Sequence, residues 1–168
     1  ITPRLDGAAD AADMARASTA IVSAISNTQT GLRGGRLGDS LINLVVETLC
    51  AEFPRLRTFA TLSPIPGFRA WLSKHAGAML ERLDDKRRAE LGRAVGFEPP
   101  QATHLLGAID KALELDAKSP VRQMLLECAA YYLGRALLEG KPVDPVARFH
   151  LGNGARVERL NWAGDPSG

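Results

Sequence analysis

The chain of 168 residues is 45% hydrophobic and 24% charged, and its formal net charge is +2. This length and composition predict one globular domain with a buried core. Basic residues are interleaved with acidic ones, and no apolar run approaches the length of about 18 residues that a membrane-spanning helix needs. We therefore expect a cytoplasmic protein that binds neither nucleic acid nor membrane.

The first part of the chain predicts a βαβ unit. Residues 1–17 indicate a loop with a short helix, and the run of Ile, Val and Ala over 18–26 predicts a strand buried on both faces. A glycine-bearing loop follows at 27–35. Apolar residues then recur at helical spacing over 37–52, and a second strand is predicted over 57–62.

Residues 68–140 change in character and predict a helical insertion. Four amphipathic segments follow one another there, and the last is well delimited, with Ser119 as N-cap, Pro120 at the first helical position and Gly140 at its end. Cys50 and Cys128 both lie among helix formers, where we expect buried thiols that act as small hydrophobes. Neither a disulfide nor a metal site is expected.

The end of the chain predicts a β-hairpin over 146–162. Two strand-like runs, 146–151 and 155–162, flank Gly152, Asn153 and Gly154. Asn-Gly between two such runs is a strong hairpin signal. The order of elements therefore indicates a mixed α/β fold with a helical insertion.

The loop TQTGLRGGRLG, residues 28–38, follows a predicted strand and opens a predicted helix. Its glycines and the helix N-terminus suit a phosphate group, and Arg33 and Arg36 add positive charge. The alternative is a glycine-rich turn that only reverses the chain. The loop is neither a P-loop nor a dinucleotide fingerprint. It resembles the pyrophosphate loop of the GNAT acetyltransferases, although Arg36 stands where that consensus has glycine.

Ser63 lies in the stretch FATLSPIPGF and is followed by two prolines. Each proline fixes its own φ and restricts the residue before it, so Ser63 and Ile65 have few backbone states. Ser63 is either a structural corner or a positioned reagent. Of the three histidines, His75 and His104 lie in amphipathic helices and read as structural, whereas His150 ends a predicted strand beside a turn.

The stretches ISNTQTGL, FATLSPIPGF and FHLGNGARVERLNW together resemble the catalytic domain of the malonyl-CoA decarboxylase family. The resemblance is close over 18–69 and 143–167, and the helical block between them matches in length and character. It implies that residues 1–168 are part of a GNAT-like catalytic domain with a helical insertion, lacking an N-terminal helical domain. The abundance of Ala, Arg and Gly with few lysines suggests a bacterial source.

The resemblance also implies site residues. Ser63 and His150 would be the catalytic pair, with His150 as proton donor and Ser63 holding the leaving carboxylate; in the family this serine is also described as a proton acceptor. The residues expected to hold malonyl-CoA are Arg33, Gly34, Gly35, Arg36, Leu37, Gly38 and Asp39. Further candidates for contact with the substrate are Gln29, Gly31, Asn153 and Asn161.

The chemistry implied is loss of CO2 from malonyl-CoA to give acetyl-CoA through a thioester enolate. No motif for a metal, biotin, pyridoxal or thiamine is visible, so no cofactor is expected and the thioester acts as the electron sink. We expect the full-length protein to be a homo-oligomer. The alternatives are a CoA-dependent N-acyltransferase and a non-catalytic CoA-binding module, and a serine hydrolase is the weakest candidate because no nucleophile elbow is present.

Overall fold

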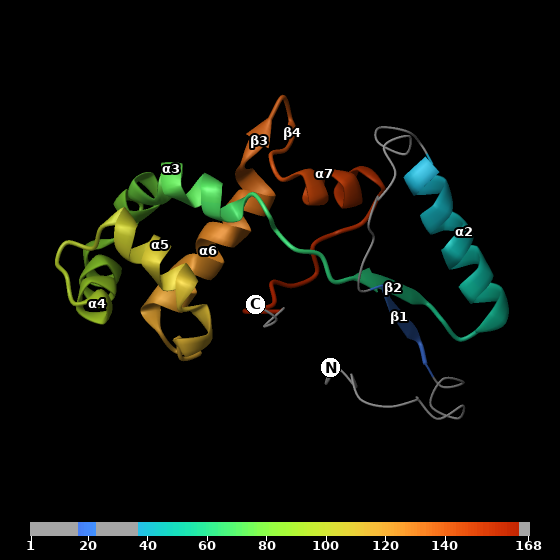
Figure 1. Cartoon of the computed structure of the whole chain (residues 1–168), viewed down its shortest axis with the longest axis horizontal. Coiled ribbons are helices and arrows are strands. Elements are labelled where there is room, and N and C mark those ends of the chain that lie inside the picture. The colour runs from blue at the N-terminus through green and yellow to red at the C-terminus, as the bar shows by residue number, and fades with distance from the viewer. Residues whose placement is uncertain (1–16, 23–36, 165–168) are drawn as a thin grey trace. The chain divides into compact units, whose positions relative to one another are not determined.

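The computed structural model describes residues 17–22 and 37–164, and the chain divides into two compact units after Ser63. The first unit, Ile1–Ser63, contains the predicted βαβ motif, and the second, Pro64–Gly168, is mainly helical (Figure 1). The expected short helix before residue 17 and the glycine-bearing loop over 27–35 lie outside the described residues. No helix in the described part of the chain is both long and apolar enough to cross a membrane.

The predicted βαβ unit is confirmed. Strand β1 spans Thr19–Val22, helix α2 spans Leu37–Glu52 and strand β2 spans Thr58–Thr61. The strands pair in parallel, with Val22 opposite Thr61, and the N–H of Leu62 donates to the carbonyl of Val22 at 3.2 Å. The carboxyl ends of the two strands therefore meet at one edge of the sheet.

The prediction that β1 is buried on both faces is wrong for the described chain. Ile21 is 50% exposed, and Leu44 on α2 is 59% exposed. The apolar run of a strand reports its capacity for burial, whereas burial itself needs a layer on each face of the sheet. The described sheet has two strands, so β1 has a single hydrogen-bonded neighbour within it.

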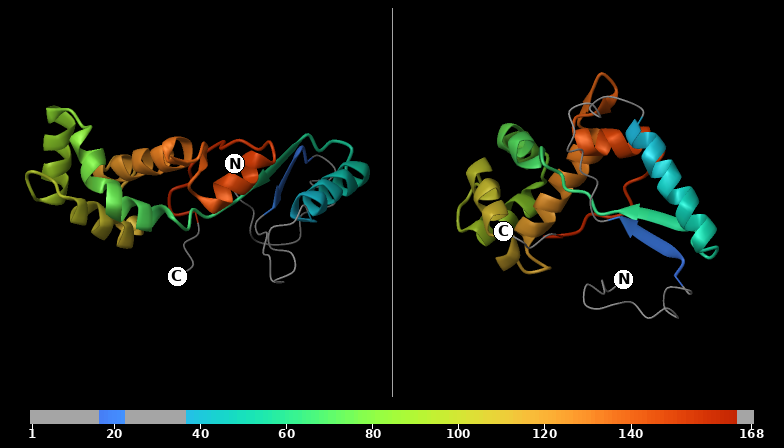
Figure 2. Two further views of the ribbon diagram at one scale, coloured as in Figure 1. Left: turned by 90° about the horizontal axis from the view of Figure 1, so that it is seen from above. Right: turned by 45° about the vertical axis from the view of Figure 1, so that its right-hand side comes forward.

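The helical insertion is confirmed as a set of packed helices that carries the main core. It comprises α3 (Phe68–Glu81), α4 (Asp85–Val95), α5 (Ala102–Asp110), the 3-10 turn η2 (Ala112–Glu114) and α6 (Pro120–Arg135). Helix α6 contacts α3, α4 and α5, so it is the central element of this unit (Figure 2). The largest fully buried side chains of the helical unit come from several of its elements, and these are Leu72, Leu91, Leu105, Leu125, Cys128, Tyr132 and Asp144.

Helix α6 begins where the sequence predicts and ends earlier. Pro120 occupies the first turn after Ser119, although the Ser119 side chain makes no capping hydrogen bond. The helix ends at Arg135, and a short hairpin follows, formed by β3 (Leu137–Leu138) and β4 (Lys141–Pro142). Glu139 and Gly140 join these strands with φ of 52° and 76°. Gly140 therefore serves a tight turn, and the predicted continuation of the helix to this glycine is wrong.

The hairpin predicted over 146–162 is also wrong. Residues Pro145–Gly152 form helix α7, and 155–161 is assigned neither helix nor strand. The Asp144 side chain caps the helix start and Pro145 occupies its first turn, both of which favour a helix over a strand. Gly154, with φ of 81°, lets the N–H of Ala155 return to the carbonyl of His150 at 3.0 Å. The Gly-Asn-Gly signal thus ends a helix.

Gly67 and Gly77 offer a matched pair of substitutions in this fold. A Cβ at Gly67 would clash with the Tyr132 hydroxyl, whereas a Cβ at Gly77 on α3 meets nothing within 4 Å. We expect Gly67→Ala to destabilise the protein by about 1–3 kcal/mol because the buried tyrosine cannot move away. Gly77→Ala should stabilise it by about 0.5–1 kcal/mol. Urea-induced unfolding measures both, and an unchanged midpoint for Gly67→Ala would contradict this packing.

The two cysteines should differ in reactivity. Cys128 is fully buried in α6, and burial raises the pKa of its thiol to about 12. Cys50 on α2 is exposed, contrary to the expectation of a buried thiol. We expect iodoacetamide at neutral pH to label Cys50 in the folded protein and Cys128 only after unfolding, because the thiolate is the reactive form. Peptide mass spectrometry measures this, and labelling of native Cys128 at the rate of Cys50 would refute it.

Candidate functional site

Ser63 lies directly beyond the carboxyl end of β2. Its hydroxyl donates to the Thr61 hydroxyl at 3.2 Å, and the side chain is exposed. In a βαβ unit, the helix that follows the first strand begins at the edge where the strands end, and ligands bind outside that edge. The topology therefore places Ser63 at the sheet edge where α2 starts.

The predicted substrate loop is described only at its end. Leu37, Gly38 and Asp39 form the first turn of α2. The remaining predicted contacts lie outside the described residues, and these are Gln29, Gly31, Arg33, Gly34, Gly35 and Arg36. The free N–H groups and the dipole of a helix N-terminus favour an anion such as a pyrophosphate. A helix start, which is the kind of site that favours an anion, and the candidate serine thus share one edge of the sheet.

The segment after Ser63 is fixed by a close contact with α6. The N–H of Phe68 donates to the carbonyl of Ile65 at 3.1 Å, and α3 starts at Phe68 with Gly67 as its N-cap. Gly67 has an ordinary φ of −82°, so the backbone conformation does not require glycine here. The lack of room for a side chain does. The Tyr132 hydroxyl occupies the position where a side chain would lie. The rigidity that the two prolines indicate is therefore supported by tertiary packing.

His150 lies on the second turn of α7, on a helix where a strand end was expected. Its side chain is half-buried, and its ring makes an edge contact with Phe149 at 5.2 Å between centroids. On the same helix, Ala147 is buried, and Leu151 packs against the core. The helix is thus anchored on the side neighbouring His150, while the imidazole retains access to solvent.

The two asparagine candidates, Asn153 and Asn161, lie beside contacts that stabilise the fold. Asn153 is the C-cap of α7, and its side-chain amide donates to the carbonyl of Phe149 at 3.0 Å. Asn161 is exposed and precedes Trp162, whose indole N–H donates to the carbonyl of Ala112 at 2.9 Å. These contacts account for the Asn-Gly and Asn-Trp pairs within the fold. A substrate contact by either asparagine stays a prediction.

The comparison with known proteins decides the family. The model of the malonyl-CoA decarboxylase C-terminal domain matches residues 1–168. The chain belongs to this family.

Relatives and a solved structure agree with this assignment. The chain is 36% identical over 160 residues to the mitochondrial malonyl-CoA decarboxylase of Rattus norvegicus, covering 90% of this chain and 32% of that protein. It is 34% identical over 165 residues to the mitochondrial enzyme of Anser anser anser, with 92% and 32% covered. The crystal structure of malonyl-CoA decarboxylase from Rhodopseudomonas palustris is similar with a TM-score of 0.64 and 41% identity, covering 91% of this chain and 33% of that one. The chain thus spans about a third of the length of these relatives.

The predicted mixed α/β class is confirmed within this family, and the finer likeness to the acetyltransferases stays a prediction. Ser63 ends the first unit and His150 lies in the second. The topology of the first unit therefore places Ser63 and the start of α2 at the same edge of the sheet, and helix α7 carries His150 and ends at its C-cap Asn153. The pairing of Ser63 with His150 stays a prediction.

His75 and His104 have structural contacts, as the sequence predicts. The His75 ring stacks on Trp71 with centroids 4.6 Å apart, and its Nδ1 lies 2.8 Å from the Trp71 carbonyl oxygen. His104 Nδ1 accepts from the N–H of Gln101 at 3.0 Å and so caps α5. Contacts within their own helices thus explain the presence of both histidines.

Sequence reasoning missed Tyr132 and Asp144. Asp144 is fully buried, and its Oδ2 accepts from the Tyr132 hydroxyl at 3.1 Å. Burial, followed by the hydrogen bond to Asp144, raises the pKa of Tyr132 to about 12, so the hydroxyl stays a donor at neutral pH. The Asp-Pro pair at 144–145 is the sequence signal that could have revealed the carboxylate, because this pair favours a helix start.

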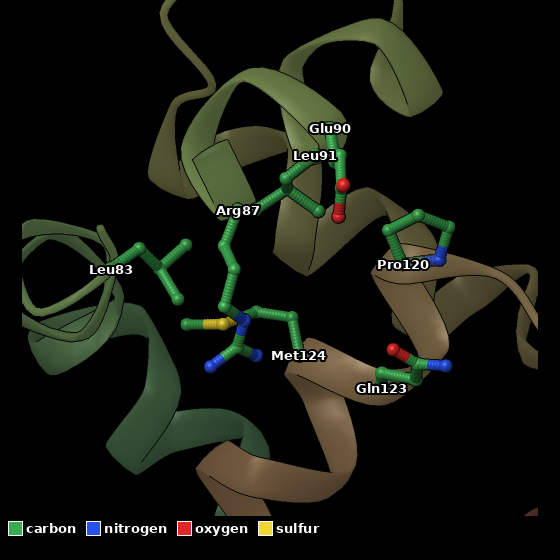
Figure 3. Close-up of a pocket in the computed structure, with 7 residues that line it drawn as sticks. All are labelled: Leu83, Arg87, Glu90, Leu91, Pro120, Gln123 and Met124. Atoms are coloured by element: carbon green, nitrogen blue, oxygen red, sulfur yellow. The ribbon is translucent and has the colours of Figure 1, made fainter. Parts of the chain in front are cut away.

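The helical unit also contains a small pocket between α4 and α6 (Figure 3). Its free volume of about 20 Å³ accommodates a water molecule and excludes a thioester. It is lined by Leu83, Arg87, Glu90, Leu91, Pro120, Gln123 and Met124. None of these is a predicted site residue, so this pocket is not the candidate active site.

Proposed function

We propose that this chain carries the catalytic site of a malonyl-CoA decarboxylase, which converts malonyl-CoA to acetyl-CoA and CO2. The observation that carries the proposal is the match of the family model over residues 1–168, a range that includes Ser63, His150 and the glycine-bearing loop. The position of Ser63 beyond β2 supports it, because ligands of parallel sheets bind at this edge.

In this proposal the CoA pyrophosphate binds at the start of α2. The seven residues expected to hold it end in the first helical turn, where backbone N–H groups have no partner within the helix. Arg33 and Arg36 supply charge that matches the diphosphate. The GNAT-like arrangement belongs to this proposal, since it would run the pantetheine arm from this edge towards the reacting carbon.

The reaction needs one carbon–carbon bond to break and one proton to be delivered. The electron pair of the breaking bond moves into the thioester to form an enolate, while the carboxylate leaves as CO2. His150 donates a proton to the resulting carbanionic carbon and is reprotonated by solvent. Acetyl-CoA is the product. The half-buried position of His150 is compatible with both steps, since the ring is anchored and still reached by water.

Ser63 has an orienting role in this chemistry. Decarboxylation is fast only when the breaking bond is perpendicular to the thioester plane, so that its electrons overlap with the carbonyl. A hydroxyl that binds the leaving carboxylate selects this conformation. Misplacement by about 1 Å can cost roughly a hundredfold in rate. The two prolines after Ser63 and the tight packing of Gly67 supply the rigidity that this role requires.

Compartment and assembly stay predictions. The relatives from Rattus norvegicus, Anser anser anser and Mus musculus are named as mitochondrial, and the similar solved structure comes from a bacterium. A cytoplasmic bacterial protein and a homo-oligomer remain our expectations for this chain.

Substitution of the two candidate residues tests the proposal. We expect Ser63→Ala and His150→Gln each to lower kcat for CO2 release from malonyl-CoA by about 10²–10⁴-fold, because orientation or proton delivery is lost. Binding of CoA should persist. The matched controls are Ser73→Ala and His75→Gln, since the Ser73 hydroxyl bonds only to the Ala70 carbonyl among the described residues and His75 stacks on Trp71.

The measurement is acetyl-CoA release by the full-length protein, followed by chromatography, with CoA binding measured by calorimetry. Absence of turnover in the unmodified protein with CoA binding retained would refute the decarboxylase and leave a CoA-binding module. Transfer of an acyl group to an amine would instead identify an N-acyltransferase. Turnover that survives in both variants would refute the assigned pair.

A further inference from the structure

The Tyr132 hydroxyl lies where three segments of the helical unit meet. Tyr132 is on α6, with 1% of its surface exposed, and its ring contacts Phe68 and Trp71 of α3 at 5.9 Å and 5.3 Å. Its hydroxyl lies against Gly67, directly after the Ser-Pro-Ile-Pro segment. The same hydroxyl donates to Asp144 at the start of α7. One rigid side chain thus touches the segment that follows Ser63 and the helix that carries His150.

The Asp144 carboxylate is fully engaged. Its Oδ1 accepts from the N–H groups of Val146 and Ala147 at 3.0 Å and 2.9 Å, and its Oδ2 accepts from Tyr132. No buried side-chain polar atom among the described residues lacks a partner. Removing the tyrosine hydroxyl would leave one carboxylate oxygen buried and unsatisfied, which is costly. Asp144 is therefore a cap whose orientation depends on Tyr132.

Helix α7 depends on its ends for its direction. It has eight residues, and isolated helices of this length are unstable in water. Asp144 fixes its start, and Asn153 with Gly154 ends it. His150 lies roughly 9 Å along the axis from the cap, so a small tilt at Asp144 becomes a displacement of the imidazole. The position of His150 is thus linked to the Tyr132–Asp144 contact through a single short helix.

We propose that Tyr132 and Asp144 are positioning residues for His150, holding α7 so that the imidazole delivers its proton to the substrate carbon. This inference rests on the proposed function, because it assigns the purpose of the contact to the same reaction. Gly67 contributes to this positioning, since any larger residue at position 67 would displace the Tyr132 hydroxyl. The raised pKa of Tyr132 supports it, because the hydroxyl remains a donor throughout the physiological range.

The test compares two neighbouring tyrosines. Tyr132→Phe removes the hydroxyl that bonds to Asp144, whereas Tyr131→Phe removes one that makes no hydrogen bond among the described residues. Asp144→Ser keeps an oxygen for the cap and removes the acceptor for Tyr132. Each variant of the full-length protein is assayed at a temperature where circular dichroism shows it to be fully folded. A role confined to stability leaves kcat unchanged under that condition.

We expect Tyr132→Phe to lower kcat by roughly tenfold to a hundredfold with KM for malonyl-CoA unchanged, since the misplaced group acts in the chemical step. Tyr131→Phe should behave as the unmodified protein. The double variant Tyr132→Phe with Asp144→Ser should lose no more than the worse single variant, because the two residues act through one contact. Additive losses, or an unchanged kcat for Tyr132→Phe, would overturn the inference.

A second readout needs no turnover. Diethyl pyrocarbonate modifies accessible imidazoles, and peptide mass spectrometry follows His75, His104 and His150 separately. We expect the modification rate of His150 to change in Tyr132→Phe while those of His75 and His104 stay the same. Equal changes at all three would indicate general loosening and overturn the inference. If the unmodified protein releases no CO2, the proposed function fails, and this labelling still decides whether the pair positions His150.

Discussion

The buried carboxylate of Asp144 is the contact on which the second unit depends. It caps α7 through two backbone N–H groups and accepts from the Tyr132 hydroxyl of the central helix α6. A buried carboxylate is tolerated only when its oxygens are satisfied, so the direction of α7 and the placement of Tyr132 are fixed together. The same hydroxyl requires glycine at position 67. The glycine at position 67, which follows the Ser63 segment, and the Asp144 cap of the helix that carries His150 are therefore both explained by the position of the Tyr132 hydroxyl.

The first unit contributes a different kind of constraint, which is topological. Parallel pairing of β1 and β2 brings their carboxyl ends to one edge, and the same edge receives the start of α2. A helix N-terminus offers donors to an anion, and Ser63 follows β2 at that edge. In the proposed function, phosphate binding and carboxylate orientation would thus both depend on this one βαβ unit. The membership of the chain in the malonyl-CoA decarboxylase family gives this arrangement a chemical interpretation.

The sequence predicts the βαβ unit and the helical insertion because the apolar pattern of their helices continues over several turns and because proline or capping residues mark the helix ends. The prediction fails for the hairpin over 146–162. Its first run, 146–151, has only six residues between a proline and a glycine, and so short an apolar run fits a strand or a helix equally well. The Asp-Pro start was decisive there, and the Asn-Gly signal misled because glycine with positive φ serves a helix end as well as a hairpin. Tyr132 and Asp144 could not be paired from sequence, since only the folded chain brings the Tyr132 hydroxyl to the carboxylate of the residue that precedes α7.

The most direct test of the account is a crystal structure of the full-length protein with a malonyl-CoA analogue that cannot lose its carboxylate. The account predicts that the pyrophosphate lies at the N-terminus of α2, that the Ser63 hydroxyl contacts the acidic group, and that the His150 imidazole faces the carbon to be protonated. It also predicts that the Tyr132–Asp144 hydrogen bond is intact. An analogue bound with Ser63 and His150 both out of contact would contradict the account.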